Sequence, residues 1–385
     1  MNQIGNYAEL FQLIDRKKFD SLVDRWGMDK GIRSLSTWEM TCALVSSMAL
    51  QIGSYRDVEM VLNIPRSTLS DALNQRCHGF FQELCEEILI QIKARTRDRK
   101  IKRAIRHILA LDSTECRVHG SLFATPNWRP KNSKTDAHSA SVKLHVVWDI
   151  AGEWIEDFRI SPARRNDTPV SRNFDIQKNK TYVFDRAYDA VDLWMKIIEN
   201  DAHFVSRLKH CHFNVSQRRR VLPDNDGVLL DTIYFPSQPT LNRLPQEQRL
   251  KARFRHIVFR DPQTKKVFDF ITSDFDSSAA SIAGIYKQRW AVELLFRWLK
   301  GHLNIRYLPA KKPNSIKTQL AIAVLLQLLL QFKKITARYR GTLWQLLRKI
   351  RTTLQREGLV GIEVPPDCRW KYPKQRSLRH ASVRK

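Results

Sequence analysis

Apolar residues recur at helical spacing through the first hundred residues of the chain. Leu10, Leu13 and Ile14 open the pattern, and the segment from Phe80 to Ile92 repeats it at intervals of three and four residues. This spacing places the apolar side chains on one face of a helix. The pattern therefore predicts a small helical N-terminal domain over residues 1–105.

Two short helices joined by a proline-containing turn are predicted inside this domain. The segments from Tyr55 to Val58 and from Ile64 to Leu73 carry the pattern, and Pro65 lies at the turn. Such a pair is typical of a helix-turn-helix, a motif that binds DNA. A helical hairpin that packs only against itself gives the same pattern. The domain is therefore a candidate for binding DNA ends, with a purely structural role as the alternative.

The period of the apolar residues changes to that of strands after a basic stretch from Lys93 to Arg106. The segments His107–Asp112 and Thr181–Asp185 are nearly continuous apolar runs, and each ends on an aspartate. Strands mixed with helices predict an α/β fold. Residues 211–250 interrupt the alternation and are typical of an insertion. The other predicted elements are strands over residues 142–150, 154–160, 203–208, 253–260 and 267–272 and a helix over residues 189–200.

A long helix, capped by Ser277 or Ser278, carries the most informative residues. Its apolar residues, Val292 and Leu299 among them, lie on one face, so the helix can pack on a sheet while Glu293 faces a cleft. A solvated amphipathic helix with an ion pair between Arg289 and Glu293 is the alternative. Four polar side chains at helical spacing share another face: Tyr286, Arg289, Glu293 and Lys300.

Three carboxylates are candidates for a common site. Asp112 and Asp185 each follow an apolar run, where an unpaired carboxylate is costly to bury. Together with Glu293 they form an oxygen-only donor set, which favours Mg²⁺ or Mn²⁺ over zinc. Two such ions can activate water on one side of a phosphodiester and stabilise the leaving oxygen on the other. The sequence therefore predicts phosphoryl transfer on nucleic acid.

The charge of the chain supports nucleic acid as the partner. The formal net charge is +27, and residues 301–385 hold 19 Lys and Arg against 3 Asp and Glu. A basic surface of this kind neutralises phosphates, so we expect the C-terminal region, residues 336–385, to contact DNA. The longest apolar run, Leu320–Leu330, is too short to cross a bilayer and is predicted to be a buried helix. We expect no membrane association and a cytoplasmic location.

The three acidic motifs resemble those of the DDE transposases of bacterial insertion sequences. Asp112 stands in Leu-Ala-Leu-Asp-Ser-Thr and Asp185 in Val-Phe-Asp-Arg-Ala-Tyr. The spacing of Tyr286, Arg289, Glu293 and Lys300 is similar to the signature of the insertion-sequence-4 family. The resemblance covers roughly residues 100–330. One departure is Ala187, which stands where many relatives have glycine before the tyrosine, and this mild change leaves every acidic residue in place.

The resemblance implies a ribonuclease-H-like catalytic domain over residues 106–335, with a β-rich insertion at about residues 211–272. The helical domain precedes it and a basic helical tail follows it. The implied activity is cut-and-paste transposition, in which the enzyme cleaves DNA at terminal inverted repeats and joins the 3′ ends to target DNA. Asp112, Asp185 and Glu293 are implied to hold two Mg²⁺ or Mn²⁺ ions.

The resemblance also implies residues that bind DNA and a dimer. Tyr286, Arg289 and Lys300 are expected to touch phosphates near the cleaved end, and Trp290, or another tryptophan in the insertion-bearing region, to stack on an unpaired base. Independently of the resemblance, we also expect Arg297 to bind DNA. The partners are double-stranded DNA, both the element ends and the target, and a second copy of the chain in a synaptic complex. Two alternatives remain open: a DNA-binding regulator that has lost the chemistry, and a nuclease of the same fold that hydrolyses DNA without strand transfer.

Overall fold

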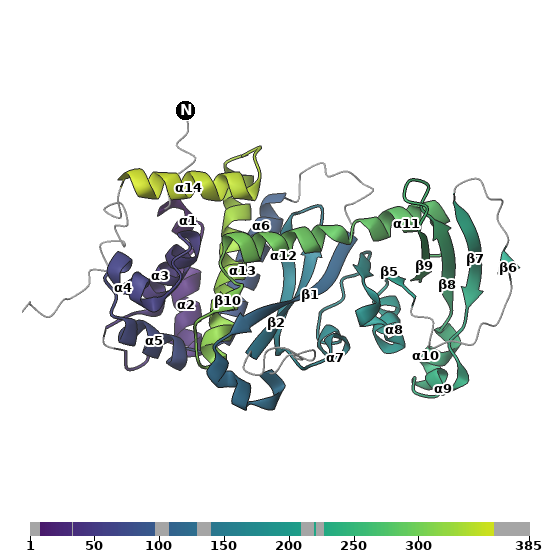
Figure 1. The fold of residues 1–385 in the computed structure, drawn as a ribbon, viewed down its shortest axis with the longest axis horizontal. Coiled ribbons are helices and arrows are strands. Elements are labelled where there is room, and N and C mark those ends of the chain that lie inside the picture. Colours follow the sequence, from purple (N-terminus) through teal and green to yellow (C-terminus); the bar gives the residue numbers. More distant parts are fainter. Residues whose placement is uncertain are drawn as a thin grey trace, which may run out of the picture.

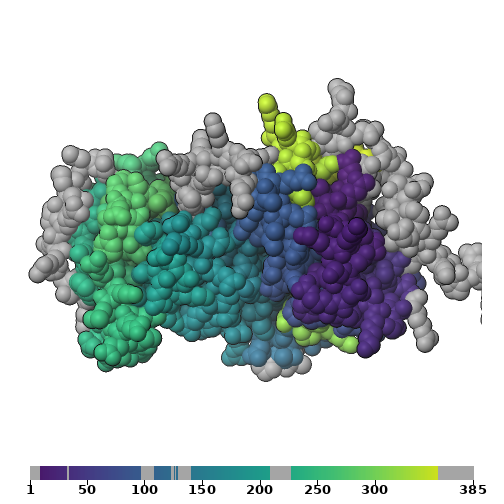
Figure 2. Space-filling view, turned by 180° about the vertical axis from the view of Figure 1, so that it is seen from behind, coloured from purple at the N-terminus to yellow at the C-terminus, as the bar shows by residue number. Residues whose placement is uncertain are grey.

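The computed structural model has N-terminal helices at one end and a long mixed sheet that extends from them to the other end (Figure 1). It describes residues 8–32, 34–96, 108–128, 140–208, 219–220 and 227–357. The N-terminal helices lie at one end of the long axis, and the strands after residue 219 lie at the other. The view from behind shows the same order, with the central strands between the two ends (Figure 2).

Six helices form the N-terminal region, as the apolar spacing predicts. Ser36 starts the third of them with a capping box, in which its side chain and that of Glu39 each bond to the other residue's backbone N–H. Asn63 adopts a left-handed conformation that ends the fourth helix, so the chain can turn through Pro65 into the fifth. The helices are α1 (Ala8–Phe11), α2 (Arg16–Trp26), α3 (Thr37–Ala49), α4 (Tyr55–Leu62), α5 (Arg66–Gln75) and α6 (His78–Thr96).

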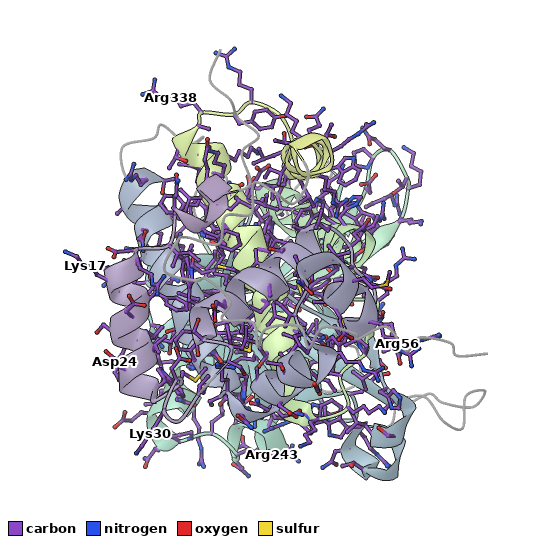
Figure 3. The ribbon with its side chains drawn as sticks, turned by 90° about the vertical axis from the view of Figure 1, so that its left-hand side faces the viewer. Lys17, Asp24, Lys30, Arg56, Arg243 and Arg338 are labelled. Atoms are coloured by element: carbon purple, nitrogen blue, oxygen red, sulfur yellow. The ribbon has the colours of Figure 1, made fainter. Side chains whose placement is uncertain are left out.

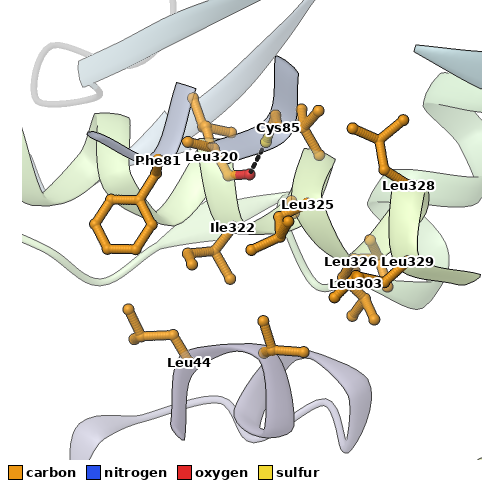
Figure 4. Packing of buried hydrophobic residues seen from close by; sticks show 14 of the residues in the cluster. Leu44, Phe81, Cys85, Leu303, Leu320, Ile322, Leu325, Leu326, Leu328 and Leu329 are labelled. Carbon is orange, nitrogen blue, oxygen red and sulfur yellow. Dashed lines mark hydrogen bonds between the residues drawn. The ribbon is translucent and has the colours of Figure 1, made fainter. Parts of the chain in front are cut away.

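Helix α13 (Pro313–Thr336) joins the N-terminal helices to the sheet in one core. Its side chains pack against α3, α6 and strand β3 (Trp154–Pro162). Figure 4 shows Ile322 and Leu325 between Leu44 of α3 and Phe81 of α6. The helix is long and apolar enough to span a membrane by composition, yet 94% of its most apolar window is buried inside the protein. The prediction of a buried helix is confirmed.

The central sheet contains parallel and antiparallel neighbours. The strand order is β3-β2-β1-β4-β5-β9-β8-β7-β6, and the short β10 pairs with β1. Strand β1 pairs in parallel with β4 and antiparallel with β2, so it lies at the change of direction in the sheet. These strands are β1 (Ile108–Val118), β2 (Ala140–Asp149), β4 (Thr181–Phe184), β5 (His203–Arg207) and β10 (Tyr307–Leu308).

The prediction that the first strand ends on Asp112 is wrong. Strand β1 continues to Val118, because Thr114, Cys116 and Val118 are buried while Glu115 and Arg117 are exposed. This alternation suits a half-buried strand, and residues 113–118 pair antiparallel with β2. Only the pairing with β4 ends near Asp112, since its register stops at Leu111 and Phe184.

The strands after residue 219 extend the central sheet. Strand β9 pairs antiparallel with β5, and β8, β7 and β6 follow outward from it. Residues 211–218 and 221–226 of the predicted insertion lie outside the described residues. The elements of this region are β6 (Arg219–Arg220), β7 (Val228–Tyr234), α9 (Gln238–Leu241), α10 (Gln246–Lys251), β8 (Phe254–Arg260) and β9 (Val267–Thr272).

The long helix predicted from residue 277 to Lys300 is two helices. Helix α11 (Ala279–Lys287), capped by Ser278, ends at Gln288, and α12 (Trp290–His302) begins after Arg289. Backbone bonds three residues apart, such as Arg289 N–H to Tyr286 C=O, tighten the chain at this junction. Both helices cross the front of the sheet, end to end (Figure 1).

The remaining helices cover the other face of the sheet and its N-terminal end. Helices α7 (Asp167–Ser171) and α8 (Val191–Glu199) lie on the face opposite α12, where Trp194 and Tyr188 are buried. Helix α14 (Leu343–Glu357) crosses the end of α13 (Figure 1). Residues 358–385, the last part of the predicted basic region, lie outside the described residues.

Candidate active site

Two of the three predicted carboxylates are neighbours across the parallel strand pair. Leu111 of β1 is the register partner of Phe184 of β4, and Asp112 and Asp185 are the next residues on each chain. Each aspartate accepts a hydrogen bond from the backbone N–H that follows it, at 2.8 Å for Asp112 and 2.7 Å for Asp185. The parallel register therefore brings together two acids that are far apart in the sequence.

Helix α12 supplies the third carboxylate. Glu293 lies in its first turn, where the helix dipole favours a negative charge. Val292, Leu295 and Leu299 of the same helix are buried on the front of the sheet, and α12 packs against β1. This packing leaves Glu293 facing the site, with about a third of its side chain exposed.

Arg289 connects Asp112 to Glu293. Its Nη1 donates a hydrogen bond to Asp112 Oδ2 at 3.1 Å, and its Nη2 donates to Glu293 Oε1 at 2.5 Å. The Arg289 side chain is 16% exposed, so water screens these ion pairs only weakly. The ion pair between Arg289 and Glu293, given above as the alternative interpretation, is thus present. Arg289 also pairs with Asp112, so it links α12 to strand β1.

The charges of Glu293 and Asp185 both act on Asp112. Burial raises the pKa of Asp112 to about 6, Ser113 N–H and Arg289 oppose the shift, and the charges of Glu293 and Asp185 add to it. Burial lowers the pKa of Arg289, but the hydrogen bond with Glu293 and the nearby carboxylates raise it overall. Asp185 and Glu293 therefore each lie close enough to Asp112 to affect its charge.

Tyr286 and Lys300 lie on either side of this group. Burial raises the pKa of the Tyr286 phenol to about 12, Arg289 acts against the shift, and Asp185 adds to it. The Arg289 guanidinium carbon lies 5.9 Å from the Tyr286 ring centre. Lys300 is half-buried further along α12, close enough to Cys116 of β1 to partly offset the upward effect of burial on the pKa of that thiol. All four residues of the predicted polar series thus face the sheet.

Trp290 and Arg297 form a separate pair away from the carboxylates. Trp290 is 51% exposed, and the Arg297 guanidinium carbon lies 5.9 Å from its ring centre. The two residues are seven positions apart, so they share one side of α12. An exposed indole beside a cation offers a surface on which a base can stack. Among the described residues, neither Trp290 nor Arg297 forms a hydrogen bond or an ion pair with Asp112 or Glu293.

The donor set suits divalent metal ions. Carboxylate oxygens are the ligands that Mg²⁺ and Mn²⁺ prefer, and the Arg289 guanidinium marks a place between Asp112 and Glu293 that accommodates a cation. Within the described residues no three His, Cys, Asp or Glu side chains form a metal-binding group. In their chemistry the oxygen donors of Asp112, Asp185 and Glu293 fit a metal site, but the described side chains are not gathered into one, and Arg289 lies between two of them.

Sequence reasoning missed two features of the site. The Arg289–Asp112 contact joins residues 177 positions apart, and helical spacing carries no signal for it. Tyr188 is buried behind the site, where burial raises its pKa and the charges of Asp167, Asp112 and Asp185 add to the effect. Its position three residues after Asp185 is visible in the sequence, but its burial depends on the fold.

A family model for the transposase DDE domain matches residues 103–329, which contain all three acids. The chain belongs to the DDE transposase family. A second model, described as a domain of unknown function (DUF4372), matches residues 6–72 of this transposase. The predicted resemblance to DDE transposases of insertion sequences is thereby confirmed.

Relatives named as transposases cover most of the chain. A transposase for insertion sequence element IS4SA from Synechocystis sp. is 36% identical over 73% of this chain and 75% of its own length. The transposase y4zB of Sinorhizobium fredii is 30% identical over 64% of this chain and 69% of its own. A transposase for element IS5377 from Geobacillus stearothermophilus is 26% identical over 86% of both chains.

A solved structure shows the same fold. The piggyBac transposase in a synaptic complex with hairpin DNA matches with a TM-score of 0.50 at 11% identity, covering 94% of this chain and 82% of that one. The mixed sheet flanked by helices is thus a ribonuclease-H-like transposase fold, as predicted. Family membership implies a DNA nuclease and strand transferase that depends in general on divalent metal ions.

Proposed function

We propose that this protein carries out cut-and-paste transposition of an insertion sequence with the YREK-type spacing of the insertion-sequence-4 family. The observation that supports the proposal is that Arg289 bridges Asp112 and Glu293, while the parallel register of β1 and β4 places Asp185 next to Asp112. Hydrolysis at the element end leaves a 3′ hydroxyl. That hydroxyl then attacks a target phosphodiester, so one P–O bond forms as another breaks and a target 3′ hydroxyl is released.

Asp112, Asp185 and Glu293 are the residues that would hold two Mg²⁺ or Mn²⁺ ions. When bound, the ions activate the attacking oxygen and stabilise the leaving oxygen. The chain's own residues position the DNA: Arg289 and Lys300 bind phosphates, and Tyr286 lies against Arg289. Trp290 and Arg297 offer a stacking and charge contact at the exposed side of α12, for an unpaired base near the cleaved end.

The N-terminal helices are proposed to bind the element ends in the same complex. A hollow of about 430 Å³ lies between α5 and residues 309–312, lined by Arg66, Lys311 and Lys312 and by no acidic side chain among the described residues. Arg56 of α4 points to the side of the molecule that carries α12, whereas Lys17, Asp24 and Lys30 point to the opposite side (Figures 1 and 3). The charge of the hollow suits a DNA backbone.

A strand-transfer assay tests the activity. The protein is incubated with Mn²⁺, DNA carrying the inverted termini that flank its gene, and a target plasmid. We expect wild-type protein to give products joined to the target, and Glu293→Gln to give neither cleavage nor joining. Glu199→Gln is the matched control, because Glu199 is an exposed glutamate on α8. Nicked donor without joined product supports the nuclease alternative, and cleavage retained by Glu293→Gln contradicts the proposed site.

A further inference from the structure

Arg289 uses the same oxygen atoms that a divalent ion between two of the acids needs. It donates to Asp112 Oδ2 and to Glu293 Oε1, while the other oxygen of Asp112 accepts the Ser113 N–H. Both a guanidinium and a divalent metal ion are attracted to the space between Asp112 and Glu293, because two carboxylates carry negative charge in a partly buried place. A guanidinium and a metal ion cannot occupy these two oxygens together without strong repulsion.

We propose that Arg289 competes with divalent metal ions for Asp112 and Glu293, and that a DNA phosphate draws Arg289 away so that DNA and metal strengthen each other's binding. This inference rests on the proposed function, in which the two carboxylates hold metal. It assigns Arg289 two alternating partners: the carboxylates in the protein alone and a phosphate when a DNA end is in place.

The chemistry of the guanidinium suits such an exchange. Its planar donors bind carboxylates and phosphates with the same forked geometry, so one partner can replace the other without a change of protonation. If a DNA phosphate binds Arg289, the carboxylates of Asp112 and Glu293 become available to the metal ion. By thermodynamic linkage, bound metal must then increase the affinity for DNA by the same factor by which DNA increases the affinity for metal.

The movement requires only that the Arg289 side chain turn, since its planar donors lie at the end of a long chain with several rotatable bonds. Arg289 lies in the junction between α11 and α12, where Gln288 and Arg289 are outside the regular turns of both helices. The Tyr286 ring, 5.9 Å from the guanidinium carbon, flanks the side chain. The acids, by contrast, are fixed by a paired strand and by a helix packed on the sheet. The movable member of the group is therefore the arginine.

Mn²⁺ binding to the full-length protein without DNA tests the competition. Free Mn²⁺ is measured by electron paramagnetic resonance for wild type, Arg289→Gln and Lys287→Gln. We expect Arg289→Gln to bind Mn²⁺ about five- to tenfold more tightly than wild type, at the lower end of typical couplings. Lys287→Gln removes one exposed positive charge from the end of α11 and is expected to match wild type. Equal gains in both variants contradict the inference, since general charge then explains them.

A short blunt-ended DNA duplex tests the exchange. The duplex is expected to tighten Mn²⁺ binding to wild type and to Lys287→Gln, and to leave binding to Arg289→Gln unchanged. Duplex that tightens Mn²⁺ binding equally in all three proteins, or in none, overturns the exchange. Arg289→Lys is the second variant, used if circular dichroism shows that the Gln variant folds poorly. It keeps the charge but cannot fork between two carboxylates, so it is expected to bind Mn²⁺ more tightly than wild type, and affinity equal to that of wild type contradicts the inference.

A further variant separates this inference from the proposed function. If Glu293→Gln binds Mn²⁺ as wild type does, the carboxylate site itself is wrong. If Glu293→Gln loses Mn²⁺ while Arg289→Gln binds it no better than wild type, the site stands and only the competition fails. If Arg289→Gln binds Mn²⁺ more tightly than wild type and Glu293→Gln loses Mn²⁺ binding, both the carboxylate metal site and the competition by Arg289 are supported.

Discussion

Asp112 is an ionisable side chain on a mostly buried strand, and its charged form costs the folded protein stability. Burial raises its pKa from 3.8 to about 6 despite the nearby Arg289. Above pH 6 Asp112 is ionised in both the folded and the unfolded chain. The charge is buried only in the folded chain, so it lowers the free energy of unfolding. Near pH 4 and below the cost is absent. Stability is therefore lost as the pH rises from about 4 to about 6.

The metal-free Asp112→Asn variant should consequently be more stable than wild type at pH 8. The free energy of unfolding should rise by at most about 3 kcal/mol, the value that corresponds to the shift of the Asp112 pKa. The rise is smaller if Arg289 loses a favourable partner. The difference should shrink toward zero near pH 4, where Asp112 is protonated. Urea unfolding at both pH values measures it, with the exposed Asp24→Asn as the control. An Asn variant that is less stable than wild type at pH 8 contradicts this electrostatic account.

The residues of the site were predictable to different degrees. Asp112, Asp185 and Glu293 stand out in the sequence by their motifs, and the parallel register of β1 and β4 places the two aspartates side by side. The contact from Arg289 to Asp112 was not predictable, because it depends on how α12 crosses the sheet. Periodicity describes one element at a time, whereas this contact belongs to two elements.

At the scale of elements, most helices and strands were predicted, and β9 (Val267–Thr272) was predicted with both its ends, but the end of β1 and the break between α11 and α12 were not. The β1 strand runs past Asp112 because its outer half stays paired with β2, and with β10 at Arg117 and Val118. The α11–α12 break occurs within a segment of continuous helical spacing. Nothing in the local sequence marks either boundary. Both are set by packing on the sheet.

A buried ion pair fixes the strands beyond β5 to the segment that leads into α11. Arg255 of β8 donates two hydrogen bonds to Asp231 of β7, at 2.8 and 2.6 Å, and further ones to the C=O groups of Asp274 and Ser277. Both side chains are at most 8% exposed. The pair therefore connects the outer strands to the start of the helix that precedes Arg289.

Arg255→Met should destabilise the protein by about 3 kcal/mol, since it leaves Asp231 charged and buried without its partner. Lys178→Met is the matched control, because it breaks the exposed pair with Asp201, and no measurable loss is expected. Chemical denaturation of both variants gives the comparison. Similar losses from the two substitutions argue against a special role for the buried pair.

At the scale of the whole molecule, the positive charge is expected to govern DNA affinity. The chain carries a net charge of +27, and the hollow lined by Arg66, Lys311 and Lys312 joins the N-terminal helices to the catalytic part. Each phosphate contact releases counterions, so affinity falls steeply with salt. The sequence predicted the charge and the partner, but the hollow is formed by segments more than two hundred residues apart.

Lys311→Ala with Lys312→Ala should lower the slope of log affinity against log salt by up to about 2. Lys17→Ala with Lys30→Ala removes the same charge from residues that do not line the hollow and that lie on the side opposite Arg56 (Figure 3), so the slope should change little. Fluorescence anisotropy with labelled duplex across a salt series measures both. A larger change in the control pair places the DNA path elsewhere.

The central claim, that Asp112, Asp185 and Glu293 surround the metal, is tested most directly by iron-directed cleavage of the polypeptide. Fe²⁺ is bound in place of Mg²⁺ in the presence of duplex DNA, ascorbate and peroxide are added, and the fragments are mapped by mass spectrometry. We expect cuts near residues 112, 185 and 293, suppressed by excess Mg²⁺. Cuts confined to other acidic segments, such as the hollow lined by Glu86, Asp157 and Asp175, contradict the account.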